Sequence, residues 1–215
     1  MKTEASLSRR LWRENREVAE ACLDHPFVRG LGDGSLPPKI FARYVAQDAV
    51  YLEAFFRAYA LAAARSEGRH HAAVVFYQLM GGVLEELSMH ARSAANLGID
   101  LVDVEPLPAT TTYVDLLMAT AWNRDLGETI AVMAPCMSLY AFLGQTLAAG
   151  QHDGHPYRDW IDGYSGDEMT ELARRLESLL DELADDTPEV HHLYRRAMEC
   201  ELAFFDSAYG DGSPS

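Results

Sequence analysis

Apolar residues recur every three or four positions along most of the chain, which is the spacing of one face of an α-helix. No stretch alternates apolar and polar residues for long enough to predict a β-strand, and no Asn-Gly turn is present. The pattern predicts an all-α fold with a single domain over residues 1–209 and a disordered tail over residues 210–215. The predicted helices, eight in number, cover residues 5–23, 38–65, 70–97, 112–123, 125–149, 157–164, 167–184 and 188–209.

The segment between the first two predicted helices is rich in helix-breaking residues. It contains, in order, His25-Pro26-Phe27, Gly30, Gly32, Gly34 and Pro37-Pro38, which together predict a loop. Proline suits the first turn of a helix, where its missing N–H group costs nothing, so the next helix is expected to begin near Pro38. That helix is apolar on nearly all sides, and we expect it to be central in the fold.

The charge of the chain excludes several classes of partner. The sequence carries 33 acidic and 18 basic residues, a formal net charge of -15. A surface this acidic repels phosphate backbones and anionic lipids, so neither nucleic acid nor a membrane is an expected partner. The chain starts without an apolar signal segment, and no apolar run is expected to reach the ~20 residues of a membrane span. Three cysteines, an odd number, favour free thiols in a reducing cytoplasm.

The segment Ala134-Pro135-Cys136-Met137-Ser138-Leu139-Tyr140 is the first candidate for chemistry. Positions i and i+4 share a helix face, so Cys136 and Tyr140 are expected to point the same way. Pro135 removes one backbone N–H group and predicts a kink beside the thiol, which could help to form a pocket. The alternative is a core helix that tolerates a proline and buries an unreactive cysteine.

Two carboxylates lie on apolar helix faces. Asp48 shares a face with Tyr51 and Phe55, where burial requires a partner, unless Asp48 lies at the solvated edge of that face. Glu201 lies one turn before Phe204-Phe205. Apolar surroundings raise the pKa of a carboxyl group, which would suit Glu201 to donate a proton near pH 7.

Glu86 and His90 lie four residues apart on the third predicted helix. Helical bundles that bind two iron ions use closely spaced Glu and His residues, so this pair could be half of a metal site. More often, a pair with this spacing is a surface ion pair or an interface contact. No second Glu/His pair with this spacing is convincing, and we therefore expect no metal and no cofactor.

A thiol, a carboxylic acid and a second carboxylate among aromatic side chains would suit covalent catalysis on a flat polar ring. The thiol would attack the ring, the acid would protonate a ring nitrogen, and the aspartate would hold an exocyclic amine. Spacing alone does not bring Cys136, Glu201 and Asp48 together, because they lie on different predicted helices.

The chain resembles the TenA/thiaminase II family over almost its whole length. The resemblance is carried by an ordered set of landmarks: His25-Pro26-Phe27, Gly34-Ser35-Leu36, Phe41, Tyr44-Val45-Ala46-Gln47-Asp48, Tyr51-Leu52, Glu86, His90, Tyr113, Pro135-Cys136, Tyr140, Tyr157, Trp160-Ile161, Tyr164, Glu201, Phe204 and Ala208-Tyr209. It implies a haem-oxygenase-like helical bundle without haem, usually a homotetramer.

The resemblance also implies a reaction in thiamin salvage. The substrate would be 4-amino-5-aminomethyl-2-methylpyrimidine, hydrolysed to the hydroxymethylpyrimidine plus ammonia, and thiamin could be cleaved by the same chemistry. Cys136 would be the nucleophile, Glu201 the acid/base at a ring nitrogen, and Asp48 the residue that holds the amino-pyrimidine edge. The implied aromatic and phenolic lining comprises Tyr51, Tyr113, Tyr140 and Tyr164.

The sequence departs from the family pattern at two positions, where Ser138 and Phe205 stand in place of tryptophans. Both changes reduce aromatic bulk, and we expect them to alter the shape of the pocket. Two other functions stay open. One is a non-catalytic pyrimidine-binding or regulatory protein, and the other is a di-iron or cofactor-free oxidase that uses Glu86 and His90.

Overall fold

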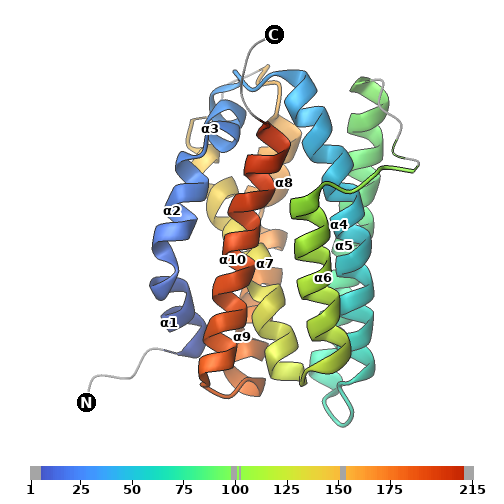
Figure 1. Ribbon diagram of the computed structural model, residues 1–215, viewed down its shortest axis with the longest axis vertical. Helices are drawn as coiled ribbons and strands as arrows, with labels where there is room; N and C mark the ends of the chain where they lie inside the picture. Colours follow the sequence, from blue (N-terminus) through green and yellow to red (C-terminus); the bar gives the residue numbers. More distant parts are fainter. Residues whose placement is uncertain (1–5, 98–100, 102, 151–153, 211–215) are drawn as a thin grey trace.

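The computed structural model describes residues 6–97, 101, 103–150 and 154–210. These residues form an all-α bundle, and no β-strand occurs among them, as the sequence pattern predicts (Figure 1). The tail predicted to be disordered lies, apart from Gly210, outside the described residues. The helices are α1 Leu7–Glu14, α2 Arg16–Asp24, α3 Pro26–Asp33, α4 Pro38–Ala64, α5 His70–Leu97, α6 Pro108–Asn123, α7 Leu126–Ala148, α8 Arg158–Ser165, α9 Asp167–Leu183 and α10 Pro188–Tyr209.

Most helix starts follow the local signals in the sequence. Prolines occupy the first turns of α4, α6 and α10, where the missing N–H group is not needed. The side chain of Asp125 caps α7 by accepting a hydrogen bond from the backbone N–H of Glu128 at 2.8 Å. The predicted boundaries of α4, α5, α7 and α10 are therefore confirmed to within one or two residues.

The predicted loop over residues 24–37 is wrong, because Pro26–Asp33 forms the helix α3. His25 caps it, since its Nδ1 accepts a hydrogen bond from the backbone N–H of Phe27 at 3.1 Å. Gly30 lies inside α3. A Cβ atom at this position would come within 3.2 Å of the backbone of Leu36, which favours a residue without a side chain. Close packing, and not a turn, therefore explains this glycine.

The predicted first helix is divided at Asn15, which separates α1 from α2. The Asn15 side chain is buried and donates a hydrogen bond from Nδ2 to the Leu11 carbonyl at 2.8 Å. Together with α3, this division brings the described helices to ten, two more than the sequence pattern predicts.

The most buried helix is α7, with 15 of 23 residues buried, whereas α4, expected to be central, has 12 of 27. Helix α7 packs against α6, α8, α9 and α10. It is long and apolar enough to cross a membrane by composition, which corrects the expectation that no such run exists. However, 78% of its most apolar window is buried inside the protein, as in the core helix of a globular fold.

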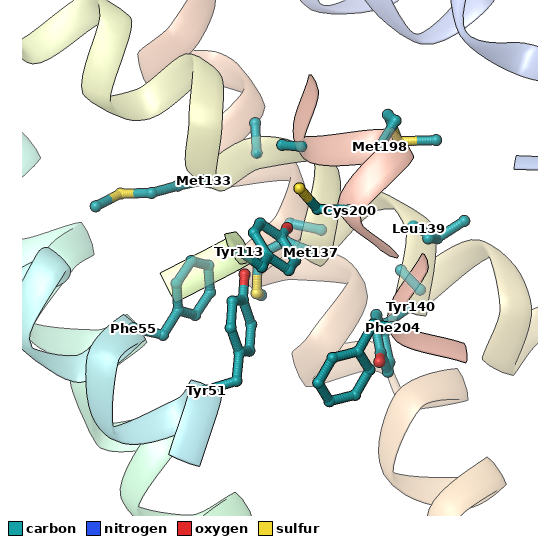
Figure 2. Close-up of a cluster of buried hydrophobic side chains, with 14 of the residues drawn as sticks. Tyr51, Phe55, Tyr113, Met133, Met137, Leu139, Tyr140, Met198, Cys200 and Phe204 are labelled. Carbon is teal, nitrogen blue, oxygen red and sulfur yellow. The ribbon is translucent and has the colours of Figure 1, made fainter. Parts of the chain in front are cut away.

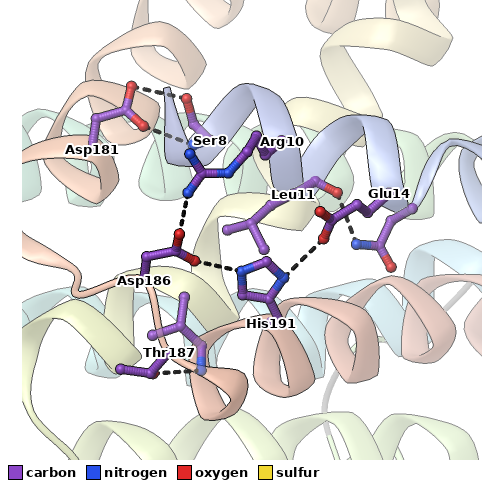
Figure 3. A network of polar contacts seen from close by, with 10 residues as sticks. Ser8, Arg10, Leu11, Glu14, Asp181, Asp186, Thr187 and His191 are labelled. Atoms are coloured by element: carbon purple, nitrogen blue, oxygen red, sulfur yellow. Dashed lines mark hydrogen bonds and ion pairs between the residues drawn. The ribbon is translucent and has the colours of Figure 1, made fainter. Parts of the chain in front are cut away.

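The first three helices and the last described helix pack together along one side of the bundle. Helices α2 and α3 run beside α10, and α4 and α5 form a long pair on the other side (Figure 1). Polar contacts fix α1 against the segment that joins α9 to α10 (Figure 3). In this network Ser8 binds Asp181, Arg10 binds Asp186, and His191 bridges Asp186 and Glu14. The network fixes the start of α10, the helix that carries Glu201.

Candidate functional site

A cavity of about 320 Å³ lies within the bundle, with side chains from α4, α5, α7, α8 and α9 on its wall. We call it the central cavity. Pockets for small molecules start at about this size. Five of the seven predicted site residues lie on its wall: Asp48, Tyr51, Cys136, Tyr140 and Tyr164. The structure therefore brings together residues from three helices, α4, α7 and α8, that sequence spacing could not connect.

Cys136 and Tyr140 share the cavity-facing side of α7, as their spacing of four residues predicts. The helix continues through Pro135, and the predicted kink stays a prediction. Cys136 is half-buried, and the pKa of its thiol is raised well above the usual value. The main cause is burial, followed by the negative charges of Glu201, Glu86 and Asp48. The resting form of this group at neutral pH is therefore the thiol.

Glu201 is 1% exposed and lies beside the cavity, off its wall. The Tyr113 hydroxyl, also away from the wall, donates a hydrogen bond to its Oε1 at 2.7 Å. The pKa of Glu201 is raised to about 8, chiefly by burial and further by Asp48, although hydrogen bonds from Tyr113 and the Cys136 thiol lower it. Glu201 is thus a protonated acid at neutral pH, and its raised pKa is the one that the apolar face predicts.

Aromatic rings from two helices surround this acid. Tyr51 from α4 and Tyr113 from α6 have ring centroids 4.4 Å apart, and Phe55 stacks on Tyr51 at 5.3 Å (Figure 2). Burial raises the pKa of both tyrosine hydroxyls well above the usual value. These phenols are therefore neutral hydrogen-bonding groups at physiological pH.

Asp48 is buried, which excludes the solvated edge of α4 as its position. Its Oδ2 lies 2.5 Å from Nε2 of His90, which is itself 1% exposed. Burial lowers the pKa of His90, but the hydrogen bond and negative charge of Asp48, together with Glu86, outweigh burial and raise it. The partner that a buried aspartate requires is therefore a histidine from α5, a pairing that the sequence did not reveal.

The predicted Glu86–His90 pair exists, with Oε1 and Nε2 4.0 Å apart. Glu86 also accepts a hydrogen bond from the Tyr164 hydroxyl. Burial, and then Asp48, raise the pKa of Glu86 to about 8, while His90 lowers it. Asp48, Glu86 and His90 each offer one ligand atom within 4.8 Å of the others, so a single cation could be held here. Within the described residues this cluster does not contain the second Glu/His pair of a di-iron site.

Tyr140 and Tyr164 form the aromatic side of the central cavity, with ring centroids 4.8 Å apart. Gly144, one turn beyond Tyr140, allows this contact. A Cβ atom at Gly144 would lie 2.5 Å from the backbone carbon of Tyr164. The backbone of α8 therefore touches α7 directly, and this contact sets the position of the Tyr164 ring.

Tyr59 lines the cavity although nothing in the sequence marked it. Its hydroxyl is buried and has no hydrogen-bond partner among the described residues. Tyr59 lies two helical turns after Tyr51 on α4, so the two share a helix face, and this spacing is the signal that could have identified it.

Ser138 and Phe205 do not lie on the cavity wall, and their effect on the shape of the pocket stays a prediction. Ser138 faces α9 and donates a hydrogen bond to Oε1 of Glu177 at 2.7 Å. Phe205 is fully buried and stacks on Phe27, with ring centroids 5.4 Å apart. Both substitutions lie in the packing around the site.

Comparisons with known proteins find relatives that match almost the whole chain. The chain is 30% identical to the aminopyrimidine aminohydrolase of Halalkalibacterium halodurans over 96% of both chains. It is 32% identical to the bifunctional TH2 protein of Arabidopsis thaliana over 94% of this chain, but spans only 37% of that relative. Among solved structures, a TenA family transcription regulator from Silicibacter sp. TM1040 has a TM-score of 0.87 and 27% identity, covering 97% of this chain and 99% of that one.

A heme oxygenase from Leptospira interrogans also aligns, with a TM-score of 0.58 and 16% identity over 94% of this chain and 98% of that one. This likeness concerns the fold alone, and it confirms the haem-oxygenase-like bundle. Residues 12–211 match the TENA/THI-4/PQQC family over most of the chain. The chain therefore belongs to the TENA/THI-4/PQQC family.

Proposed function

We propose that this protein is an aminopyrimidine aminohydrolase, which hydrolyses 4-amino-5-aminomethyl-2-methylpyrimidine to the hydroxymethylpyrimidine and ammonia. The observation that carries the proposal is that Cys136 and Asp48 lie on one cavity wall, with the buried carboxyl group of Glu201 beside it. The family relative named aminopyrimidine aminohydrolase supports the same reaction. Thiamin is a second candidate substrate of the same chemistry.

The first step is addition of the thiol to the pyrimidine ring. Because the pKa values of Cys136 and Glu201 are both raised, neither group is ionised at rest. Glu201 gives its proton to a ring nitrogen and takes the thiol proton, so that the sulfur–carbon bond forms without a free thiolate. One hydrogen and one sulfur are thereby added across the ring, and aromaticity is lost.

In the second step the ring nitrogen supplies an electron pair, and the exocyclic carbon–nitrogen bond breaks. Ammonia leaves with the bonding pair, and an exocyclic methylene forms. Water then adds to the methylene carbon and gives one proton to the departed ammonia, which becomes ammonium. Departure of the sulfur restores the aromatic ring: Glu201 gives its proton to the sulfur and takes the proton from the ring nitrogen, which regenerates both Cys136 and Glu201.

Binding of the ring is assigned to the aspartate and the tyrosines. Asp48, held by His90, accepts hydrogen bonds from the 4-amino edge. Tyr51, Tyr140 and Tyr164 on the cavity wall contact the faces and edges of the ring, and Tyr113 holds Glu201. No step in this scheme requires a cofactor.

The test is ammonia release by Cys136→Ser, compared with Cys200→Ser, a thiol on α10 that is off the cavity wall. We expect Cys136→Ser to stay folded and lose nearly all turnover, and Cys200→Ser to stay active. Turnover by Cys136→Ser at the wild-type rate would refute the nucleophile assignment. Tight binding of the pyrimidine by the wild type without ammonia release would instead favour a binding or regulatory protein.

Assembly as a homotetramer is part of the same proposal. Val74, Tyr77 and Leu84 are each more than half exposed and lie on one stripe of α5. An exposed apolar stripe of this kind is typical of an interaction surface. Light scattering on the purified protein tests it, and a monomeric mass would refute this part of the proposal.

A further inference from the structure

Glu86 lies on the wall of the central cavity together with Asp48 and Cys136. The reaction scheme above gives it no role. Its carboxylate accepts a hydrogen bond from Tyr164, and its Oε1 is 4.0 Å from Nε2 of His90. The side chain is 23% exposed and forms part of the cavity wall. This group can therefore contact a bound molecule.

The order of atoms around an aminopyrimidine ring predicts which part of the substrate meets Glu86. The ring nitrogen that Glu201 protonates is adjacent to the carbon that the sulfur attacks. The next carbon carries the aminomethyl group, and the carbon after that carries the 4-amino group held by Asp48. The leaving group therefore lies between Cys136 and Asp48, on the side of the ring away from Glu201.

Glu86 and Asp48 are close neighbours on the cavity wall. A carboxylate oxygen of Glu86 lies within 4.8 Å of the ligand atoms of both Asp48 and His90. Cys136 lines the same wall, whereas Glu201 lies off it. Glu86 thus shares the wall with the thiol and with Asp48, the two groups between which the leaving group lies.

The charge of the cavity favours a cation at this position. Its wall carries the carboxyl groups of Asp48, Glu85, Glu86 and Glu168 against the single guanidinium group of Arg92. The substrate's exocyclic amine is a primary ammonium at neutral pH. A carboxyl group on the cavity wall can bind this ammonium group, because opposite charges stabilise each other.

We propose that Glu86, oriented by Tyr164, binds the primary ammonium group of the substrate and thereby selects aminomethyl pyrimidines as the preferred substrate class. This inference rests on the proposed function. The ammonium group donates to the Glu86 carboxylate until the carbon–nitrogen bond breaks, and the nitrogen leaves as neutral ammonia with the bonding pair. A leaving group without an N–H donor cannot make this contact.

The experiment measures binding and needs no turnover. In a Cys136→Ser background, Glu86→Gln is compared with the parent by calorimetry, with the aminomethylpyrimidine and the hydroxymethylpyrimidine as ligands. We expect the Kd for the aminomethyl compound to rise about 10- to 100-fold, the effect of losing a charged hydrogen bond, and that for the hydroxymethyl compound to rise less than about fivefold. Glu53→Gln, an exposed carboxylate on α4, is the matched control and should change neither.

Equal weakening of both ligands, or no weakening of either, would overturn the inference. Loss of aminomethyl binding in EDTA would also overturn it, since a cation would then occupy the position. Weaker binding of the aminomethyl compound alone would support the inference. If the wild-type protein then released no ammonia, the inference would stand and the proposed hydrolysis would be refuted.

Discussion

Glu201→Gln should make the protein more stable while it removes the activity. Glu201 is 1% exposed, and burial raises its pKa to about 8 from the model-peptide value of 4.5. The unfolded chain ionises this group above pH 4.5, whereas the folded protein keeps it protonated until about pH 8. The unfolded state therefore binds fewer protons in that window, and the free energy of unfolding falls as the pH rises.

The pKa difference gives the size of this effect. Linkage between the two pKa values predicts that Glu201 lowers the free energy of unfolding by about 1 kcal/mol at pH 5, about 3 kcal/mol at pH 7 and about 4 kcal/mol at pH 8. Glutamine does not titrate, and its side-chain oxygen can still accept the hydrogen bond from Tyr113. The free energy of unfolding of the variant should therefore exceed that of the wild type, by a difference that grows from pH 5 to pH 8.

Urea unfolding of the wild type and Glu201→Gln at pH 5, 7 and 8 measures the gain, with Glu53→Gln as an exposed control. Ammonia release should fall at least about 100-fold in Glu201→Gln, because the amide cannot relay a proton. A stability difference between the variant and the wild type that is the same at pH 5 and pH 8 would refute the reasoning. It would show that the raised pKa of Glu201 does not lower the free energy of unfolding of the wild type.

Two further predictions concern the neighbours of these groups. Tyr113→Phe removes a hydrogen bond that lowers the pKa of Glu201. The fall in activity at alkaline pH should therefore occur at a higher pH than in the wild type. A fall at the same pH or at a lower pH would contradict this. Gly144→Ala forces α7 and α8 apart, because a Cβ atom would lie 2.5 Å from the Tyr164 backbone. We expect a loss of about 1–3 kcal/mol in urea unfolding and reduced turnover, and wild-type values of both would contradict it.

The fold was predictable where local chemistry determines it. Asp125 as a cap and Pro38 and Pro188 in first turns predict three helix starts, because these signals act within one turn. The helix α3 was missed because Gly30 was taken for a loop residue, although close approach to Leu36 requires it. A glycine required by a distant segment cannot be distinguished locally from one required by a turn.

The candidate site was predictable in part for the same reason. The shared face of Cys136 and Tyr140 follows from helical spacing, and the raised pKa of Glu201 follows from its apolar neighbours. The pairing of Asp48 with His90 joins residues 42 positions apart in different helices. No periodicity within either helix contains that contact, so only the packing of α4 against α5 reveals it.

Helix α7 has a consequence for how the chain is made. Its apolar surface is covered on one side by α10, the last helix of this bundle, and α10 in turn packs against α2 and α3, which lie near its beginning. The bundle therefore cannot close during synthesis until α10 has emerged from the ribosome. A polypeptide that terminates before α10 leaves this apolar helix partly uncovered, and exposed apolar surface of this kind promotes aggregation and degradation. Completion of the bundle therefore depends on the same helix that carries Glu201.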